Sequence, residues 1–210
     1  YDIDSKFAGL NRLECREKAI DSLSELNLMG EIKPFTHSVG HCDRCDEVIE
    51  PMITKQWYVA METIAEPARK AVRSKDIEII PKRFEKIYFD WMDNIRDWPV
   101  SRQLWWGHQL PVWYCNLCSK EIVEYDDPSK CNSCGSDQLT RDPDVLDTWF
   151  SSGLWPHSTL GWPDETDDLD YFYPGSVMET GYDILFFWVA RMIMMGIQNM
   201  GDVPFKTIYL

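Results

Sequence analysis

Residues 172–210 read FYPGSVMETGYDILFFWVARMIMMGIQNMGDVPFKTIYL, and this stretch predicts the fold. The part up to Gly181 ends in a short strand, 182–200 has the apolar density of a buried helix, and 203–210 is a second apolar strand. Two strands joined through a helix run parallel, because an antiparallel pair needs only a tight turn. A buried helix between them is typical of a parallel β-α-β crossover, so we expect an α/β fold.

The start of that helix predicts a ligand site. Thr180 precedes Asp183 by three residues, a spacing typical of a capping box, and a helix start directly after a strand often presents free N–H groups to ligands. Gly181 would let a ligand approach the backbone closely. Ile184 and Trp188 share a helical face, so the stretch would suit an amino acid with a short aliphatic side chain. Most such helices simply bury these side chains, and that alternative stays open.

Four cysteines indicate a metal site. Cys115, Cys118, Cys131 and Cys134 form two Cys-x-x-Cys pairs with twelve residues between them. Two tight pairs on a short loop can place four thiolates around one Zn²⁺, at about 2.3 Å each. A closed four-sulfur site has no open coordination position, so its role is structural. Four free thiols or a redox dithiol are the alternatives, and the double pair favours metal over both.

A third pair, Cys42 and Cys45, is half of a similar site. Two ligands do not complete the four-coordinate shell of a structural zinc ion. Three readings stay open. The missing pair lies outside the sequence, or His37, His41 or Cys15 completes the site, or no metal binds and the histidines make loop hydrogen bonds.

Composition and charge limit the class of protein. The 210 residues are 44% hydrophobic, which is enough for a core, and carry a net charge of −14. That charge argues against a protein whose whole surface binds nucleic acid, but it is compatible with a local basic groove. The most apolar window, 183–197, contains Asp183 and Arg191 and is shorter than the roughly 20 residues that cross a membrane. Paired cysteines without a signal sequence favour metal in a reducing compartment over disulfides.

The rest of the chain carries further periodic patterns. Apolar residues at three- and four-residue intervals predict a helix over 9–28, ended at Met29 and Gly30. We expect a strand over 50–61, a helix over 62–74, and a strand followed by a helix within 77–106. In the last helix, Phe84, Tyr88 and Trp91 fall on one face, which indicates a face that packs against the core. Because the chain lacks an initiator Met and stops at a strand-like run, we expect a piece of a longer protein.

Five segments together resemble the class I aminoacyl-tRNA synthetases, most closely the valine-specific ones, and the resemblance extends over essentially the whole chain. They are THSVGHCDRC (36–45), KQWYVAM (55–61), SRQLWWGHQLPVWYC (101–115), DPDVLDTWFSSGLWPHSTLGWP (142–163) and TGYDILFFWVARMIMMG (180–196). The Trp-Trp-Gly-His and Gly-Tyr-Asp-Ile-Leu-Phe-Phe-Trp runs favour valine over the isoleucine and leucine enzymes. The run DWPVSRQ departs from the Cys-Ile more usual before Ser-Arg-Gln, which we interpret as a packing change.

The resemblance implies an order of domains. It assigns 1–62 to the end of an editing insertion domain, 63–100 to a return linker, 101–141 to a junction with a four-cysteine zinc knuckle, and 142–210 to the second half of a Rossmann-type catalytic domain.

The resemblance also implies roles for single residues. Trp149, Ile184 and Trp188 would line a valine side-chain pocket, with Asp183 beside them. Gly181 and Asp183 would lie at the adenylate ribose. The four-cysteine knuckle would hold structural Zn²⁺.

The complete enzyme so implied activates valine with ATP and Mg²⁺ and transfers it to the 3′ end of tRNA(Val). It edits threonine, because a pocket that selects by size cannot strongly reject a near-isostere of valine. The family's two ATP signatures, a His-x-Gly-His-type motif and a Lys-Met-Ser-Lys-Ser loop, are absent, so we expect no catalytic residue in this stretch and no activity from it alone. We expect a cytoplasmic, monomeric parent without membrane contact, whereas the piece itself would self-associate through unpaired strand edges.

Three other functions compete with this one. A synthetase for isoleucine or leucine is disfavoured by a pocket walled by Trp149 and Trp188. A zinc-ribbon binding module without catalytic ancestry would explain the cysteines, but it would leave the β-α-β segment without a purpose. A stand-alone relative that edits or binds tRNA in trans is disfavoured by the acidic charge.

Overall fold

The computed structural model describes residues 7–50 and 53–210. It divides into two compact units, Tyr1–Ile53 and Thr54–Leu210, and each is described by itself. Within the described residues, no helix is long and apolar enough to cross a membrane.

Among its described residues, the first unit contains one helix, α1 (Arg12–Glu25), which confirms the helix predicted near the start of the chain. It begins where the Asn11 side chain accepts a hydrogen bond from the Leu13 N–H, at 3.0 Å. It ends before the predicted stop at residues 29–30, because Asn27 turns into the left-handed region at φ 54°. None of its side chains is buried within this unit.

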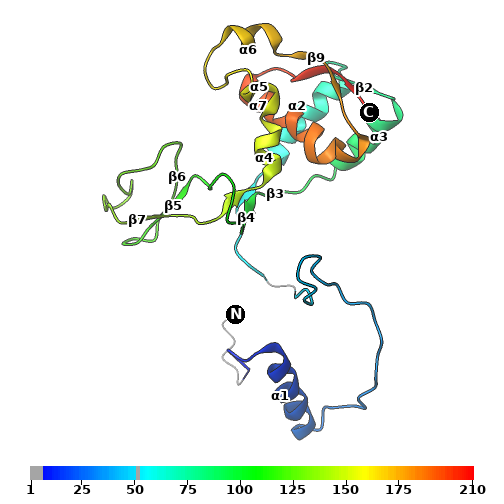
Figure 1. The fold of residues 1–210 in the computed structure, drawn as a ribbon, viewed down its shortest axis with the longest axis vertical. Coiled ribbons are helices and arrows are strands. Elements are labelled where there is room, and N and C mark those ends of the chain that lie inside the picture. Colours follow the sequence, from blue (N-terminus) through cyan, green and yellow to red (C-terminus); the bar gives the residue numbers. More distant parts are fainter. Residues whose placement is uncertain (1–6, 51–52) are drawn as a thin grey trace. The chain divides into compact units, whose positions relative to one another are not determined.

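The second unit is built on a three-stranded parallel sheet with the order β2-β10-β9. The strands are β2 (Glu78–Ile80), β9 (Gly175–Glu179) and β10 (Phe205–Tyr209). In the central strand, Ile208 pairs with Met178 on one side and Ile79 on the other, and all three side chains are buried. The predicted parallel β-α-β crossover and the α/β class are therefore confirmed (Figure 1).

The connection between β9 and β10 differs from the single capped α-helix that the sequence predicts. It runs as a 3₁₀ turn η1 (Tyr182–Ile184), a π-helix η2 (Leu185–Val189) and α7 (Ala190–Met200). The predicted capping box is wrong, because the cap position of η1 is Gly181, which has no side chain to accept a hydrogen bond. The Thr180 N–H instead donates to the Tyr209 carbonyl, at 3.1 Å, so Thr180 is still hydrogen-bonded to the central strand β10. Short π segments inside helices are frequent at functional sites.

Helices pack around α7, whose side chains from Ala190 to Gly196 are all buried. Its neighbours, seen together in Figure 1, are α2 (Glu62–Arg73), α4 (Thr148–Gly153) and α5 (Trp155–Ser158). The predicted packing stripe lies on α3 (Arg83–Met92): Phe84 and Tyr88 are buried, and Trp91 stacks on Phe186 with ring centroids 5.5 Å apart. That prediction is confirmed.

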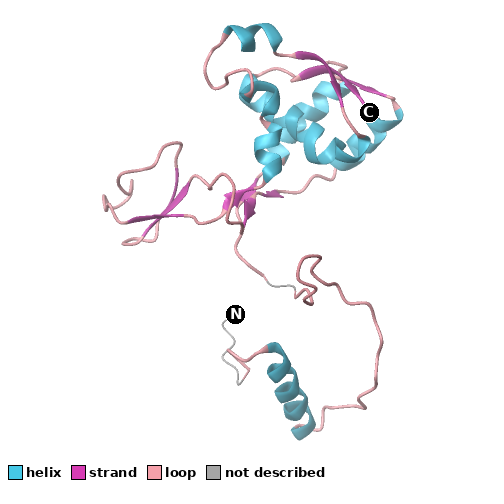
Figure 2. Cartoon of the chain, in the orientation of Figure 1, coloured by secondary structure: helices cyan, strands magenta, loops and turns pink. Residues whose placement is uncertain are grey.

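Short antiparallel pairs connect this core to the cysteine-rich segment, most of which is loop (Figure 2). They are β1 (Tyr58–Val59) with β3 (Trp98–Pro99), β4 (Ser101–Arg102) with β8 (Val145–Leu146), and β5 (Val112–Cys115) with β6 (Glu121–Val123) and β7 (Leu139–Arg141). A further helix, α6 (Asp167–Phe172), precedes β9. The strand predicted over 50–61 is thus reduced, within the described residues, to β1.

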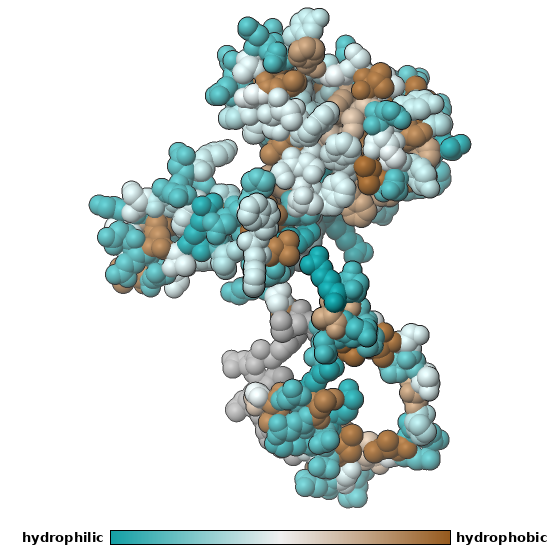
Figure 3. Space-filling model, in the orientation of Figure 1, coloured by the Kyte–Doolittle hydropathy of each residue, from teal (hydrophilic) through white to brown (hydrophobic). Residues whose placement is uncertain are grey.

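Hydrophobic residues also reach the surface in several separate places (Figure 3). The two tryptophans that follow β4, Trp105 and Trp106, are almost fully exposed. On the parallel sheet, Val177 of the edge strand β9 is 62% exposed. Such edges and patches are typical of surfaces that a partner covers.

Gly153 allows the close contact between α4 and α7. A Cβ atom added there would lie 2.5 Å from the Met195 sulfur and 3.6 Å from the Arg191 Cβ. We expect Gly153→Val to destabilise the chain by about 1–3 kcal/mol, because the added branches overpack this contact. Urea unfolding of both proteins measures the difference. Gly30→Val is the matched control, since an added Cβ there meets nothing within 4 Å. Equal stability of Gly153→Val and the original chain would contradict the packing described.

Candidate functional site

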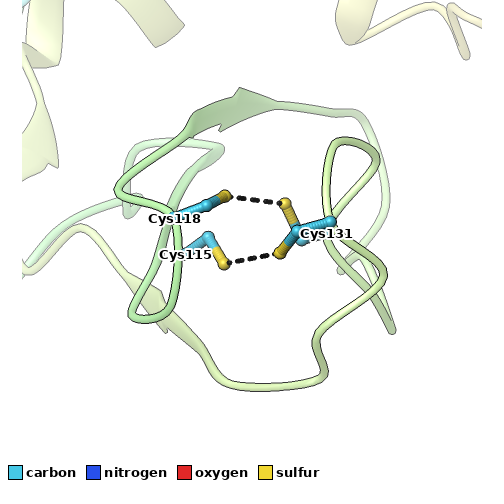
Figure 4. A group of neighbouring side chains, drawn as sticks. Cys115, Cys118 and Cys131 are labelled. Atoms are coloured by element: carbon cyan, nitrogen blue, oxygen red, sulfur yellow. Dashed lines mark hydrogen bonds between the residues drawn. The ribbon is translucent and has the colours of Figure 1, made fainter.

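The four predicted zinc ligands lie together. Their sulfur atoms are all within 4.8 Å of one another, with Cys115 and Cys134 3.5 Å apart and Cys118 and Cys131 3.6 Å apart. Two loops bring the pairs face to face (Figure 4). A tetrahedron of sulfurs around Zn²⁺ at about 2.3 Å has edges of about 3.8 Å, so the cluster has the size of a zinc site. The donor set is four soft sulfur atoms, and as thiolates they would suit Zn²⁺ and leave no open position.

Both cysteine pairs sit in the same kind of turn. In each turn, the N–H of the first cysteine donates to the carbonyl five residues later, and its carbonyl accepts from the N–H four residues later. In the first turn these bonds join Cys115 to the Lys120 carbonyl and the Ser119 N–H. In the second they join Cys131 to the Ser136 carbonyl and the Gly135 N–H. The residue after each second cysteine is left-handed, with φ 58° at Ser119 and 76° at Gly135. Glycine adopts that conformation without cost, whereas Ser119 is held there by its turn.

These turns aim backbone N–H groups at the first sulfur of each pair. The N–H of Cys118, followed by that of Leu117, lowers the pKa of Cys115 to about 6. The N–H groups of Cys134 and Ser133 lower the pKa of Cys131 in the same way. A lowered pKa favours the thiolate, which is the form that binds metal. The pKa of Cys118 and the pKa of Cys134 are instead raised, by burial and by hydrogen bonds from the neighbouring sulfurs, so the second cysteine of each pair would lose its proton to a bound metal.

A small core supports this knuckle. Trp113, Ile122 and Leu139 of its three strands pack against Cys115 and Cys131. The Arg141 guanidinium lies over the Trp113 ring, 5.0 Å from its centroid. Because this cluster contains only a few apolar side chains, a bound metal would contribute a large share of the knuckle's stability.

Cys42 begins a turn of the same kind. Its N–H donates to the Glu47 carbonyl at 2.8 Å, the Asp46 N–H returns to the Cys42 carbonyl at 2.9 Å, and Asp46 has φ 59°. The N–H groups of Arg44 and Cys45 lower the pKa of Cys42. The first cysteine of this pair therefore has the local geometry of the two knuckle turns.

The structure does not bring further ligands to Cys42 and Cys45 from the residues that the sequence suggested. Among the described residues, only the four-cysteine cluster brings three or more such ligands together. The His41 Nδ1 atom lies 2.6 Å from the Asp46 carbonyl, and the His37 ring stacks on Phe35. Neither histidine, nor Cys15, forms a ligand cluster with Cys42 and Cys45.

Three of the predicted ligand-site residues follow the C-terminal end of β9. Gly181 is the residue before η1, and Asp183 and Ile184 belong to that turn. The Asp183 carboxylate folds over Gly181, where it contacts the position that a Cβ would take, so a larger residue would displace it. Asp183 is exposed and Ile184 is half-buried. The carboxyl ends of parallel strands are where α/β proteins bind ligands.

The two predicted pocket tryptophans lie on elements that pack together. Trp149 of α4 is half-buried and stacks on Phe187 of η2, with centroids 5.9 Å apart. Trp188 of η2 is half-buried and donates its indole N–H to the Ser152 carbonyl of α4, at 2.9 Å. α4 and η2 are thus held together through these two rings.

Sequence reasoning missed a buried charged cluster next to Trp149. Asp147, which precedes α4, lies within 4 Å of both Arg102 and Arg191. Burial lowers the pKa of Arg191 to about 10, and the Asp147 charge opposes that shift. The signal in the sequence was Arg191, an arginine in the middle of an apolar helix, which we interpreted only as an argument against a membrane span.

Residues 5–210 match the family described as tRNA synthetases class I (I, L, M and V). The chain belongs to the class I tRNA synthetases. The resemblance described from the five sequence segments is therefore confirmed. Proteins named valine–tRNA ligase are 62% identical over 203 residues (Dehalococcoides mccartyi), 58% over 208 residues (Clostridium perfringens) and 53% over 209 residues (Clostridium tetani).

These matches cover 97–100% of this synthetase chain and 23–24% of the relatives. The chain therefore spans about a quarter of their length. The fold also resembles the Mycobacterium tuberculosis methionyl-tRNA synthetase in complex with methionyl-adenylate, with a TM-score of 0.56 over 81% of this chain and 28% of that one. At 13% sequence identity, this likeness concerns the fold alone.

The cysteine geometry predicts that the knuckle binds zinc. We expect Cys131→Ser to lower the zinc content of the purified chain by about one ion, because three thiolates do not close the site. Atomic absorption against protein concentration measures the ratio. Cys15→Ser is the control, since Cys15 lies on α1, outside any ligand cluster of the described residues. An unchanged ratio in Cys131→Ser would show that the cluster does not hold the metal.

Proposed function

We propose that the protein containing this chain joins valine to tRNA(Val) at the expense of ATP, and that this chain carries the valine pocket. The observation behind the proposal is the identity of 53–62% with valine–tRNA ligases along the whole chain. The packing around η1, η2 and α4 supports it, because half-buried rings of α4 and η2 contact one another just after η1, the turn that follows the C-terminal end of β9, and the carboxyl ends of parallel strands are where α/β proteins bind ligands.

In this proposal, Trp149, Ile184 and Trp188 enclose the isopropyl group of valine. Asp183 is exposed and charged, so it can accept hydrogen bonds from the valine ammonium group or the adenylate ribose. Gly181 leaves the backbone open to the same ligand. In the activation step, the valine carboxylate would attack the α-phosphate of ATP, bound with Mg²⁺, to form valyl-adenylate, and pyrophosphate would leave. The residues of this chain would orient the carboxylate for that attack and exclude larger amino acids by size, which is catalysis by positioning.

The domain order implied by the family extends the proposal. Residues 1–62 would end the editing domain that removes threonine, 63–100 would return to the catalytic domain, 101–141 would form the zinc junction, and 142–210 would form the second catalytic half. The contacts of 63–100 add a detail, since this segment contributes β2 to the parallel sheet and α2 to the core. A separate editing site has a physical reason, because a pocket that selects by size cannot strongly reject threonine, in which a hydroxyl replaces one methyl group of valine.

The metal sites would have structural roles. The four-cysteine knuckle would stabilise the junction over residues 101–141. Cys42 and Cys45 would supply two ligands of a second Zn²⁺ site, and its other ligands would come from outside this chain. The turn geometry at Cys42 supports this second assignment. Reduced, paired cysteines fit a cytoplasmic protein. We expect the whole protein to act as a monomer.

Valine-dependent ATP–pyrophosphate exchange tests the proposed function. We expect the full-length protein to catalyse exchange with valine, and Trp149→Ala to raise the KM for valine about 10–200-fold, because one pocket wall is lost. The isolated 210-residue chain should give no exchange. Tyr125→Ala, which truncates a fully exposed ring, is the matched control. Faster exchange with isoleucine or leucine than with valine would overturn the proposal.

A further inference from the structure

A single buried carboxylate joins the strands that leave the core to the helix that carries Trp149. Asp147 is 5% exposed. Its Oδ2 atom accepts a hydrogen bond from the Trp98 indole N–H at 2.9 Å and forms an ion pair with Arg102 at 3.0 Å. Its Oδ1 atom accepts from the backbone N–H of Trp149 at 3.3 Å. The two oxygens therefore hold β3 and β4 on one side and the start of α4 on the other.

The backbone of Asp147 is held by the same strands. Its N–H donates to the Val100 carbonyl at 2.7 Å, and its carbonyl accepts from Phe150 at 2.9 Å. The residue before it, Leu146, pairs with Ser101 across β4 and β8. The register of these short strands thus fixes where α4 begins.

Arg191 makes a second connection to the same tryptophan. Its guanidinium lies 3.8 Å from the centroid of Trp98 and 5.7 Å from that of Phe187, the ring that stacks on Trp149. Its Nη1 atom lies 3.8 Å from Asp147 Oδ2, which is an ion-pair distance but too long for a hydrogen bond, and neither Nη1 nor Nε has a hydrogen-bond partner. The guanidinium is therefore held by ring stacking and by the charge of Asp147.

Removing one member of this cluster would leave the others uncompensated. The Asp147 side chain is 7% exposed and that of Arg191 is 9% exposed, so water replaces a lost partner poorly. Arg102, at 38%, is the most accessible member. A charge left unpaired in such surroundings is costly, so the neighbouring side chains would rearrange to bring it to water or to a new partner.

We propose that Asp147, together with Arg102 and Arg191, is a positioning residue that fixes the Trp149 ring and thereby sets the size of amino acid that the pocket accepts. The effect on substrate size rests on the proposed valine pocket, whereas the effect on the ring does not. In this arrangement the strands at the junction control the pocket without touching the amino acid.

The position of the ring can be measured without any activity. In the 210-residue chain labelled with 5-fluorotryptophan, the ¹⁹F line that Trp149→Phe removes belongs to Trp149. We expect Asp147→Asn and Arg102→Gln to shift or broaden this line. Arg102→Lys, which keeps the charge, should restore most of it. Asp144→Asn is the control, because this nearby carboxylate bonds to Gln103 and not to α4, and it should leave the line in place.

The substrate effect is measured in the full-length protein. We expect Asp147→Asn and Arg102→Gln to raise the KM for valine about tenfold and to change the KM for ATP less than about twofold, because misplacement of a pocket wall weakens valine binding selectively. The rate of isoleucine activation relative to valine should rise. Asp144→Asn should match the original enzyme.

The outcomes separate the two claims. A Trp149 line unchanged in both variants would overturn the positioning role, whatever the kinetics. If Asp147→Asn does not fold, Arg102→Gln decides, since it leaves the cap of α4 intact. A moved line in a protein that does not activate valine would leave the positioning role standing and overturn the proposed function. A moved line with an unchanged valine KM would overturn the control of substrate size.

Discussion

The pairing of β10 with both of its neighbours is the constraint on which the larger unit depends. β10 hydrogen-bonds to β9 and to β2, two strands from distant parts of the sequence, and all three run parallel. Because parallel strands need a covering helix, α7 shares one buried core with the sheet, and α2, α4 and α5 pack around it. The position of η1 follows directly, since β9 ends at Glu179 and the chain must turn there into the crossover.

The sequence predicted those features that depend on local spacing. Two Cys-x-x-Cys pairs determine a four-sulfur cluster almost by themselves, and alternating strand and helix patterns predicted the crossover. The capping box failed because the Thr180 N–H is used by Tyr209, a strand partner that no local pattern reveals. The Asp147 cluster was missed for the same reason: its members come from three separate elements, and only the folded chain brings them together.

In the larger unit, different interactions stabilise the cysteine knuckle and the proposed valine pocket. The knuckle has few apolar contacts and four thiols placed for metal, so its order would come largely from coordination. The proposed pocket instead relies on ring stacking and on a buried charge cluster around α4 and η2. β8 lies between the knuckle and α4 in sequence and pairs with β4, which precedes the knuckle, so both ends of the knuckle segment are tied to the start of α4.

A crystal structure of the full-length protein with a non-hydrolysable valyl-adenylate analogue would show whether this chain carries the valine pocket. We predict that the isopropyl group lies between Trp149, Ile184 and Trp188, with the Asp183 carboxylate at the ammonium group or the ribose. An analogue bound elsewhere, with these three side chains packed only against the protein, would contradict it.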